Sequence, residues 1–249
     1  MSETYIPKRA MLIYAHPDDI EFSAGGTAAK WAIHGSEVYY IVITDGNIGS
    51  HEEGMTAEKL IETRRSEQRA AAKTAGAKEC IFLGYQDGLL QPSLELRKEL
   101  VRLIRRYRPN AIICGDPTNY FPSENRVNHP DHRAAGTAAL DAAFPAAEMP
   151  LLYPELEAEG LSPHKVNYIY VSNPKDPANY FVDITETMDL KIKALRQHVS
   201  QLGEWDPEEP IKKWNKETGK IVGFKFAERF LRITLKEPEI ESEAGSANE

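Results

Sequence analysis

The sequence predicts a single α/β domain built on a mostly parallel β-sheet that is flanked by helices. Short apolar runs alternate with longer helical patterns four times before residue 145. This alternation is typical of strand–helix–strand units, whose strands run parallel and whose helices cover the sheet. The length of 249 residues also suits one α/β domain.

The expected elements follow from the apolar patterns in chain order. Four apolar runs predict buried strands and four amphipathic stretches predict helices. The strands are 10–15, 38–44, 80–85 and 111–115, and the helices are 27–35, 56–76, 93–107 and 132–144. Runs 166–172 and 180–185 are consistent with two more strands, and 188–202 with another helix.

Two segments lack the pattern of regular elements. Residues 145–163 are rich in Pro and Glu, which predicts a surface excursion. Residues 236–249 contain five Glu, one Lys and no aromatic side chain, so they offer little apolar area to bury. We therefore expect a domain over 1–235 and an acidic, disordered tail over 236–249.

The composition excludes some classes of partner. The formal net charge of −8 opposes attraction to nucleic acid and to anionic membranes. No apolar run approaches the ~20 residues that span a bilayer, and the first ten residues lack a signal-peptide pattern. We expect a cytoplasmic protein whose Cys80 and Cys114 are inert thiols inside buried strands.

Two tetrads follow the first and fourth predicted strands: HPDD at 16–19 and HPDH at 129–132. The carboxyl ends of parallel strands share one edge of the sheet, where ligands of such folds bind. Pro130 suits the first position of a helix, which makes His129 its N-cap and places His132 one turn away. The two tetrads are therefore expected to meet.

Together the tetrads can form a metal site. A catalytic divalent metal takes three protein ligands and leaves a position open for water, and imidazole with carboxylate suits zinc. His16, Asp19 and His132 supply that set, although Fe²⁺ or another divalent metal also suits it. In an extended segment Asp18 would point away from Asp19 and be free to act as general base towards the metal-bound water.

The remaining residues of the second tetrad also have expected roles. A protonated His129 would stabilise an oxyanion or protonate a leaving amine. Asp131 would orient a histidine ligand from behind.

The motifs Ala15–Asp19 and His129–His132 resemble those of the LmbE-like or PIG-L de-N-acetylases, zinc enzymes that remove acetyl groups from N-acetylglucosamine-type substrates. The likeness extends from about residue 10 to 202. It implies a Rossmann-like (LmbE-like) fold, the ligands and base assigned above, and His129 as acid or oxyanion stabiliser. Where many members have an acidic residue after the two Asp, this chain has Ile20.

The resemblance also bears on substrate and assembly. Residues 180–201 are similar to the diacetylchitobiose deacetylases of the family. A small-molecule amino sugar is therefore the expected partner. Family members often form trimers or hexamers, which implies a homo-oligomer.

Several other residues are candidates for substrate binding or support. Arg64 shares a helical stripe with Glu67. The resemblance implies that Arg64 contacts substrate, and the alternative is a surface ion pair between the two. Loop residues at the expected edge of the sheet suit sugar binding: Tyr85, Asp87, Asp116, Tyr120 and Asn128. Among the other histidines, His198 matches a family stretch and is expected to pack or to support the site.

The leading hypothesis is a zinc-dependent hydrolase that removes an N-acetyl group from an amino sugar or its conjugate. One alternative is a mononuclear Fe(II) oxygenase-type site, which oxygen dependence of turnover would reveal. The other is a non-catalytic sugar- or metal-binding module, which would release no acetate from N-acetylglucosamine conjugates.

Overall fold

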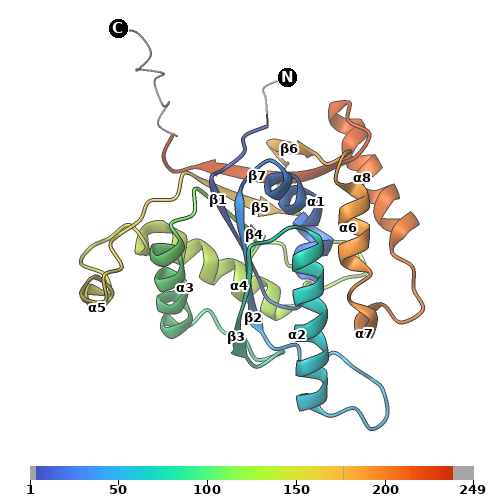
Figure 1. The fold of residues 1–249 in the computed structure, drawn as a ribbon, viewed down its shortest axis with the longest axis horizontal. Coiled ribbons are helices and arrows are strands. Elements are labelled where there is room, and N and C mark those ends of the chain that lie inside the picture. The colour runs from blue at the N-terminus through green and yellow to red at the C-terminus, as the bar shows by residue number, and fades with distance from the viewer. Residues whose placement is uncertain (1–3, 176, 238–249) are drawn as a thin grey trace, which may run out of the picture.

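The computed structural model describes residues 4–175 and 177–237, which form one seven-stranded sheet with the order β3-β2-β1-β4-β5-β7-β6 (Figure 1). The first five strands are parallel, and β7 runs antiparallel to both β5 and β6. The strands are β1 (Arg9–Tyr14), β2 (Glu37–Thr44), β3 (Glu79–Tyr85), β4 (Ala111–Gly115), β5 (Tyr168–Ser172), β6 (Tyr180–Asp183) and β7 (Ala227–Thr234). The prediction of a mostly parallel α/β sheet is confirmed.

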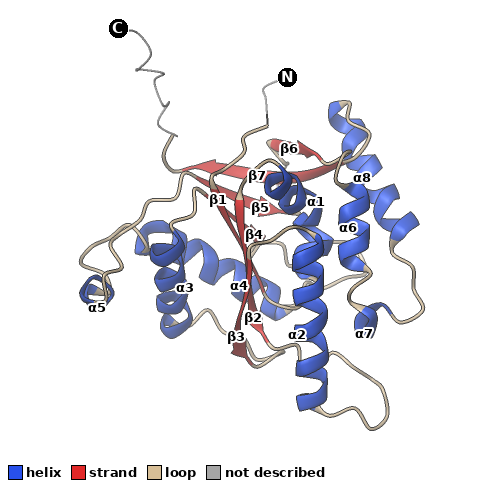
Figure 2. Ribbon diagram, viewed as in Figure 1, coloured by secondary structure: helices blue, strands red, loops and turns tan. Residues whose placement is uncertain are grey.

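Helices cover both faces of the sheet: α3 and α4 lie on one face, and α1, α2, α6 and α8 on the other (Figure 2). Successive residues of β1 alternate between the two cores, with Met11 and Ile13 in one and Leu12 and Tyr14 in the other. The helices are α1 (Asp19–Ile33), α2 (Ala57–Thr74), α3 (Leu94–Tyr107), α4 (Pro130–Asp141), η1 (Ala142–Ala146), α5 (Pro154–Ala158), α6 (Met188–Leu195), α7 (Val199–Leu202) and α8 (Glu208–Val222).

The strand order creates a crevice next to β1. The chain passes outward from β1 through β2 to β3 and then returns to β4 on the other side of β1. The loops after β1 and β4 therefore separate at this point, and open α/β sheets bind ligands at such a switch point. The two histidine tetrads lie there because one follows β1 and the other follows β4.

The C-terminal part differs most from the prediction. Residues after 202, which the sequence left unassigned, form α8 and β7, and β7 inserts between β5 and β6. The helix expected over 188–202 is instead two helices, α6 and α7, separated by residues 196–198. Lys236 and Glu237 of the expected tail hydrogen-bond to Asn167 and Tyr168, and residues 238–249 lie outside the described residues.

The segment 145–163, expected as a surface excursion, is anchored in part. Ala146, Ala147 and Leu156 are buried against α3 and its neighbours. Arg105 of α3 is itself buried and donates hydrogen bonds to four carbonyl groups of this segment, those of Ala146, Ala147, Met149 and Leu152. The excursion is therefore attached to the core at its start.

The state of the two cysteines agrees with the prediction of inert thiols. Cys80 and Cys114 are free thiols on β3 and β4, which β2 and β1 separate. Burial raises the pKa of each thiol to about 12, as expected for inert groups.

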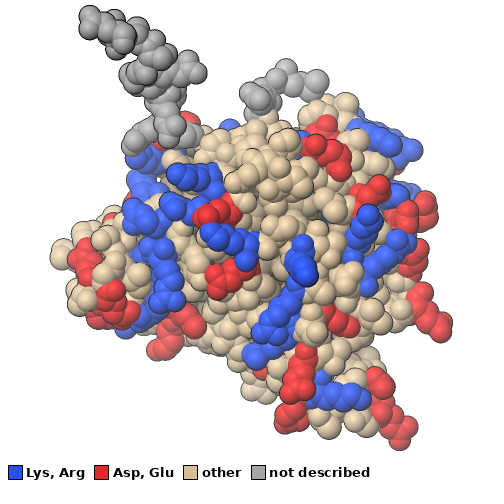
Figure 3. All heavy atoms as spheres, in the orientation of Figure 1, with Lys and Arg blue, Asp and Glu red and all other residues tan. Residues whose placement is uncertain are grey.

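Among the described residues, no helix combines the length and apolar character that crossing a membrane requires. Acidic and basic side chains are interspersed on the face shown in Figure 3.

The glycine pair of α1 provides a matched test of its packing. A Cβ on Gly26 would lie 2.7–2.9 Å from three atoms of Ile184, whereas a Cβ on Gly25 would meet Lys191 at an ordinary 3.5 Å. We expect Gly26→Ala to lower the free energy of unfolding by about 1–3 kcal/mol through overpacking. Gly25→Ala should leave it equal or raise it by up to about 1 kcal/mol. Denaturant unfolding of both variants tests this, and equal stabilities would contradict the close contact.

Candidate active site

The loop after β1 turns sharply into α1 at Asp18. Asp18 has φ 99° and ψ −30°, in the left-handed region, and precedes the first helical residue, Asp19. The expectation of an extended segment here is therefore wrong. The turn brings the Asp19 carboxylate back onto its own loop, where it accepts a hydrogen bond from the main-chain N–H of His16 at 2.8 Å.

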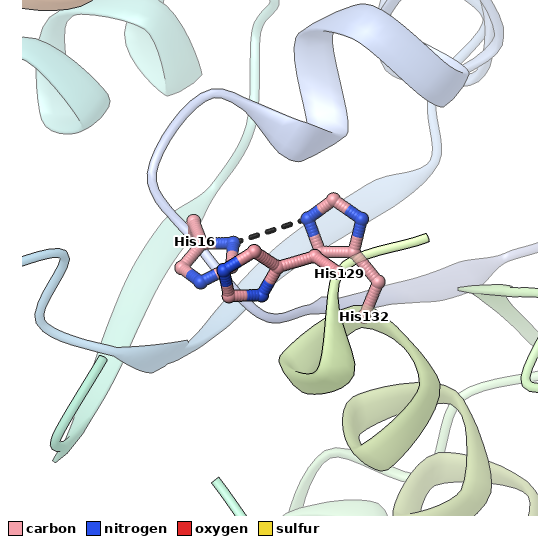
Figure 4. A group of neighbouring side chains, drawn as sticks. All are labelled: His16, His129 and His132. Atoms are coloured by element: carbon pink, nitrogen blue, oxygen red, sulfur yellow. Dashed lines mark hydrogen bonds between the residues drawn. The ribbon is translucent and has the colours of Figure 1, made fainter. Parts of the chain in front are cut away.

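Three side chains from the two tetrads converge in the crevice. His16 Nδ1 lies 3.1 Å from His132 Nε2 (Figure 4). His132 Nε2 also lies 3.1 Å from Asp19 Oδ1. The other carboxylate oxygen of Asp19, Oδ2, lies 3.4 Å from His16 Nδ1 and so closes the triangle of these three residues. The structure thus brings together the three residues that the sequence predicts as metal ligands.

The size of this triangle fits a tetrahedral metal ion. Ligand atoms at the usual zinc distances of about 2.0–2.1 Å from a common centre are separated by about 3.3 Å in a tetrahedron. The separation of 3.1 Å between His16 Nδ1 and His132 Nε2 is close to this value, and each of these nitrogens lies 3.1 or 3.4 Å from one of the two oxygens of Asp19. The donor set of two imidazoles and one carboxylate also matches the chemistry of zinc sites.

The second nitrogen of His16 contacts two buried carboxylates. Its Nε2 lies 3.0 Å from Asp87 Oδ1 and 3.3 Å from Asp131 Oδ2. Asp131 is held by the main-chain N–H groups of Gly88 and Leu90, at 2.7 and 3.2 Å. A proton on Nε2 therefore has acceptors, which leaves the Nδ1 lone pair for a metal ion.

The electrostatics of the cluster favour a bound cation. Burial lowers the pKa of His16, but hydrogen bonds to Asp131, Asp19 and Asp87 outweigh it and raise the pKa to about 12. Burial raises the pKa of the Asp19 carboxyl, yet His132 and His16 bring it well below its usual value. Ionised carboxylates around an imidazole make a site that stabilises positive charge.

Two other groups of side chains lie close enough to hold a metal ion. One is His16, His129 and His132, and the other is His16, Asp87 and Asp131, with ligand atoms within 4.8 Å of one another in each. The second group uses His16 Nε2, whose contacts with the two carboxylates explain its closeness without an ion. We favour the triangle with Asp19 because its separations of 3.1 to 3.4 Å suit a tetrahedral ion and because it leaves His16 Nε2 to the two carboxylates.

His129 caps α4 and faces the ligands. It is the N-cap residue, as the sequence predicts, and its Nδ1 accepts the N–H of Asp131 at 3.2 Å. Nε2 therefore carries the proton of the neutral ring and can donate it. The ring lies edge-on to His16, with the centroids 4.7 Å apart. Burial and the neighbouring His16 lower the pKa of His129, which favours a neutral donor over the imidazolium that we expected.

Asp18 has the properties of a base at neutral pH. Burial and the charge of Asp19 raise its pKa to about 7, although Arg64, His198 and His16 lower it. Arg64 Nη2 lies 3.5 Å from Asp18 Oδ2. A carboxylate whose pKa lies near the working pH is suited to taking a proton from water and returning it.

The residues predicted to bind substrate fall into two groups, those that line the cavity and those that make their contacts elsewhere. Arg64 is buried and donates hydrogen bonds to the carbonyl groups of Pro17 and Gly46, and its ion pair is with Asp18. Tyr85 points to α3, where its hydroxyl donates a hydrogen bond to Glu99. Asn128 and Asp116 line the cavity beside the cluster, and Asn128 Oδ1 contacts His132 Nδ1 at 3.2 Å. Asn128 thus orients a predicted metal ligand.

A cavity of about 740 Å³ opens beside Asp19 and His132. Its near wall comes from the start of α1, with Phe22, and from the loop after β4, with Asp116 and Asn128. Its far wall comes from residues that the sequence did not single out: Ser172, Asn173, Pro174, Lys175, Trp214 and Arg229. No pattern in the sequence links Trp214 or Arg229 to the tetrads, because α8 and β7 were not predicted.

The fold and the histidine–carboxylate cluster define an LmbE-like α/β protein. Residues 11–143 match the family described as GlcNAc-PI de-N-acetylase (PIG-L). The chain belongs to this family of deacetylases, so the resemblance noted in the sequence is confirmed. The match includes both tetrads and ends soon after α4.

Individual relatives cover most of the chain. It is 35% identical over 227 residues to diacetylchitobiose deacetylase of Thermococcus kodakarensis, covering 89% of this chain and 81% of that protein. It is 25% identical over 264 residues to a 1D-myo-inositol 2-acetamido-2-deoxy-alpha-D-glucopyranoside deacetylase of Saccharopolyspora erythraea, covering 86% and 82%. N,N'-diacetylchitobiose deacetylase from Pyrococcus horikoshii, solved with its inhibitor MPG, superposes with a TM-score of 0.83 at 31% identity, covering 92% and 84%.

Proposed function

We propose that the protein is a zinc-dependent N-deacetylase that hydrolyses the acetamido group of an amino sugar or a GlcNAc-type conjugate to a free amine and acetate. The observation that carries the proposal is the triangle of His16, His132 and Asp19, with Asp18 as its sequence neighbour. The two named relatives, which act on an acetylated disaccharide and an acetylated inositol glycoside, support the substrate class.

His16, His132 and Asp19 would hold the ion. When bound, a zinc ion polarises a carbonyl oxygen and lowers the pKa of water towards about 7. Asp87 and Asp131 accept the Nε2 proton of His16, and Asn128 contacts the far nitrogen of His132. These contacts orient both rings so that His16 Nδ1 and His132 Nε2 face the ion, which would displace any proton from these two nitrogens on binding.

The chain's own groups account for the proton transfers. Asp18 takes a proton from the water whose oxygen bonds to the acetyl carbon. The same proton is then available to the sugar nitrogen as the carbon–nitrogen bond breaks. The Nδ1 of the neutral His129 is already an acceptor, so its Nε2–H donates a hydrogen bond to the carbonyl oxygen of the acetyl group while negative charge develops there.

The reaction is tested by incubating protein of defined metal content with N,N'-diacetylchitobiose, N-acetylglucosamine and an N-acetylglucosaminyl-inositol. We expect acetate and free amine in equal amounts, at the same rate with and without oxygen. Release of neither product from any of the three would contradict the deacetylase proposal. Turnover that needs oxygen would favour the Fe(II) alternative.

The far wall of the cavity is expected to bind the part of the substrate that is not deacetylated. Trp214 is 41% exposed and lines the cavity, where its ring can lie against a sugar face. We expect Trp214→Ala to raise KM for diacetylchitobiose about tenfold, equivalent to about 1.4 kcal/mol, with less effect on N-acetylglucosamine.

The control for this variant is Ile221→Ala. Ile221 lies on the same helix, is 64% exposed and does not line the cavity. KM should stay at the wild-type value in this variant. An equal rise of KM for disaccharide and monosaccharide in Trp214→Ala would argue against the second sugar position.

A further inference from the structure

A single peptide group, that between Pro17 and Asp18, is held on both sides by α2. Arg64 Nη2 donates to the Pro17 carbonyl at 2.7 Å, and Gln68 Oε1 accepts the Asp18 N–H at 2.8 Å. Arg64 and Gln68 lie one turn apart on the same face of the helix. The orientation of this peptide sets where the Asp18 side chain leaves the main chain.

Gln68 is connected to two further polar side chains. Its Nε2 donates to Glu21 Oε1 at 3.0 Å, and Glu21 Oε2 lies 3.2 Å from His198 Nε2. We call these three residues, Gln68, Glu21 and His198, the polar relay. Each has 0% of its surface exposed, and they come from α2, α1 and the residue before α7.

A fully buried polar chain needs a reason, because each member costs free energy unless it is hydrogen-bonded. The relay ends at the N–H of Asp18, a non-glycine residue whose φ is 99°. A non-glycine residue in this region is strained and persists only where its surroundings hold it. The contacts of Gln68 and Arg64 are the ones that hold it here.

We propose that Gln68, supported by Glu21 and His198, is a positioning residue that keeps Asp18 in its left-handed conformation and so directs its carboxylate. The catalytic part of this inference rests on the proposed function of Asp18. The conformational part stands on the hydrogen bonds alone and has a readout of its own.

The first test is Gln68→Met, which keeps the approximate volume and removes both hydrogen bonds. We expect kcat to fall about 10- to 100-fold, KM to change less than threefold and the bound zinc to stay at the wild-type level. In the same variant the Asp18 amide should exchange its hydrogen at least tenfold faster, while the amides of β1 stay protected. That exchange is measurable whether or not the protein deacetylates any substrate.

The second test is a rescue. In Gln68→Glu the new carboxylate still accepts the Asp18 N–H, but it lies against the carboxylate of Glu21. The two negative charges repel each other, so activity should fall. Adding Glu21→Gln restores the pattern, because the new amide donates to residue 68 and accepts from His198. We expect kcat of the double variant to be at least tenfold higher than kcat of Gln68→Glu. Two independent sites would not show this coupling.

Thr187→Val is the matched control. Thr187 is fully buried, and its hydroxyl donates to the Gly26 carbonyl, away from Asp18. We expect it to lower Tm as Gln68→Met does while kcat keeps its wild-type value. The proposal is overturned if Gln68→Met keeps wild-type kcat and Asp18 exchange, if its loss of activity follows loss of zinc, or if Thr187→Val loses kcat equally. A wild-type protein that releases no acetate would overturn the proposed function, and the exchange rate of Asp18 would still decide the conformational claim.

Discussion

Asp18→Asn is expected to lower kcat about 10²- to 10⁴-fold, the usual contribution of a general base. The amide has the shape of the carboxylate but cannot take a proton from water. The zinc content should remain at the wild-type level, because Asp18 is not part of the ligand triangle. Steady-state kinetics together with metal analysis of the purified variant measure both quantities.

The control for Asp18→Asn is the same change at Asp189, which lies on α6 with a side chain 80% exposed. That variant should match the wild type in rate and metal content. If Asp18→Asn turns over within a factor of a few of the wild type, Asp18 has no role as base.

His132→Ala is expected to abolish zinc binding and to reduce kcat/KM about 10³-fold or more, since a metal ion contributes several kcal/mol of transition-state stabilisation. The His132 side chain is 37% exposed, so its removal should leave the fold intact. Chelation of the wild type should have the same effect on activity. It should also remove about 4 kcal/mol of stability if the metal was present at a thousand times its Kd.

His129→Ala decides between the two ligand sets that contain His132. If the ligands are His16, His132 and Asp19, this variant keeps its zinc and loses activity only through the missing donor. If the three histidines bind the ion, zinc is lost as in His132→Ala. Zinc content measured on both variants, with the exposed His51 changed to Ala as control, distinguishes the two sets.

The sequence predicts the sheet and the ligand triangle well because both depend on local patterns. Continuous apolar runs define the parallel strands, and the ends of such strands necessarily share an edge. The residues that follow β1 and β4 therefore lie at one edge, and His16 and His132 meet there because these two strands are neighbours in the sheet.

The sequence predicts much less about conformation and long-range contacts. The left-handed Asp18 has no local signal such as glycine, because side chains 46 and 50 residues away hold it. The resemblance to the family implied that Arg64 contacts substrate, yet its donors bind main-chain carbonyl groups. Glu21 lies two residues after the first tetrad, and the buried polar contact that it makes with His198 could be recognised only in three dimensions.

The far wall of the cavity has a consequence for how this enzyme can diversify. The family match stops at residue 143, whereas Lys175, Trp214 and Arg229 come from the loop after β5, from α8 and from β7. Under the proposed function, we expect exchanges in that later portion to change which glycoside is accepted while the two tetrads keep their arrangement. A library of variants at those three positions is therefore expected to change substrate preference with few substitutions.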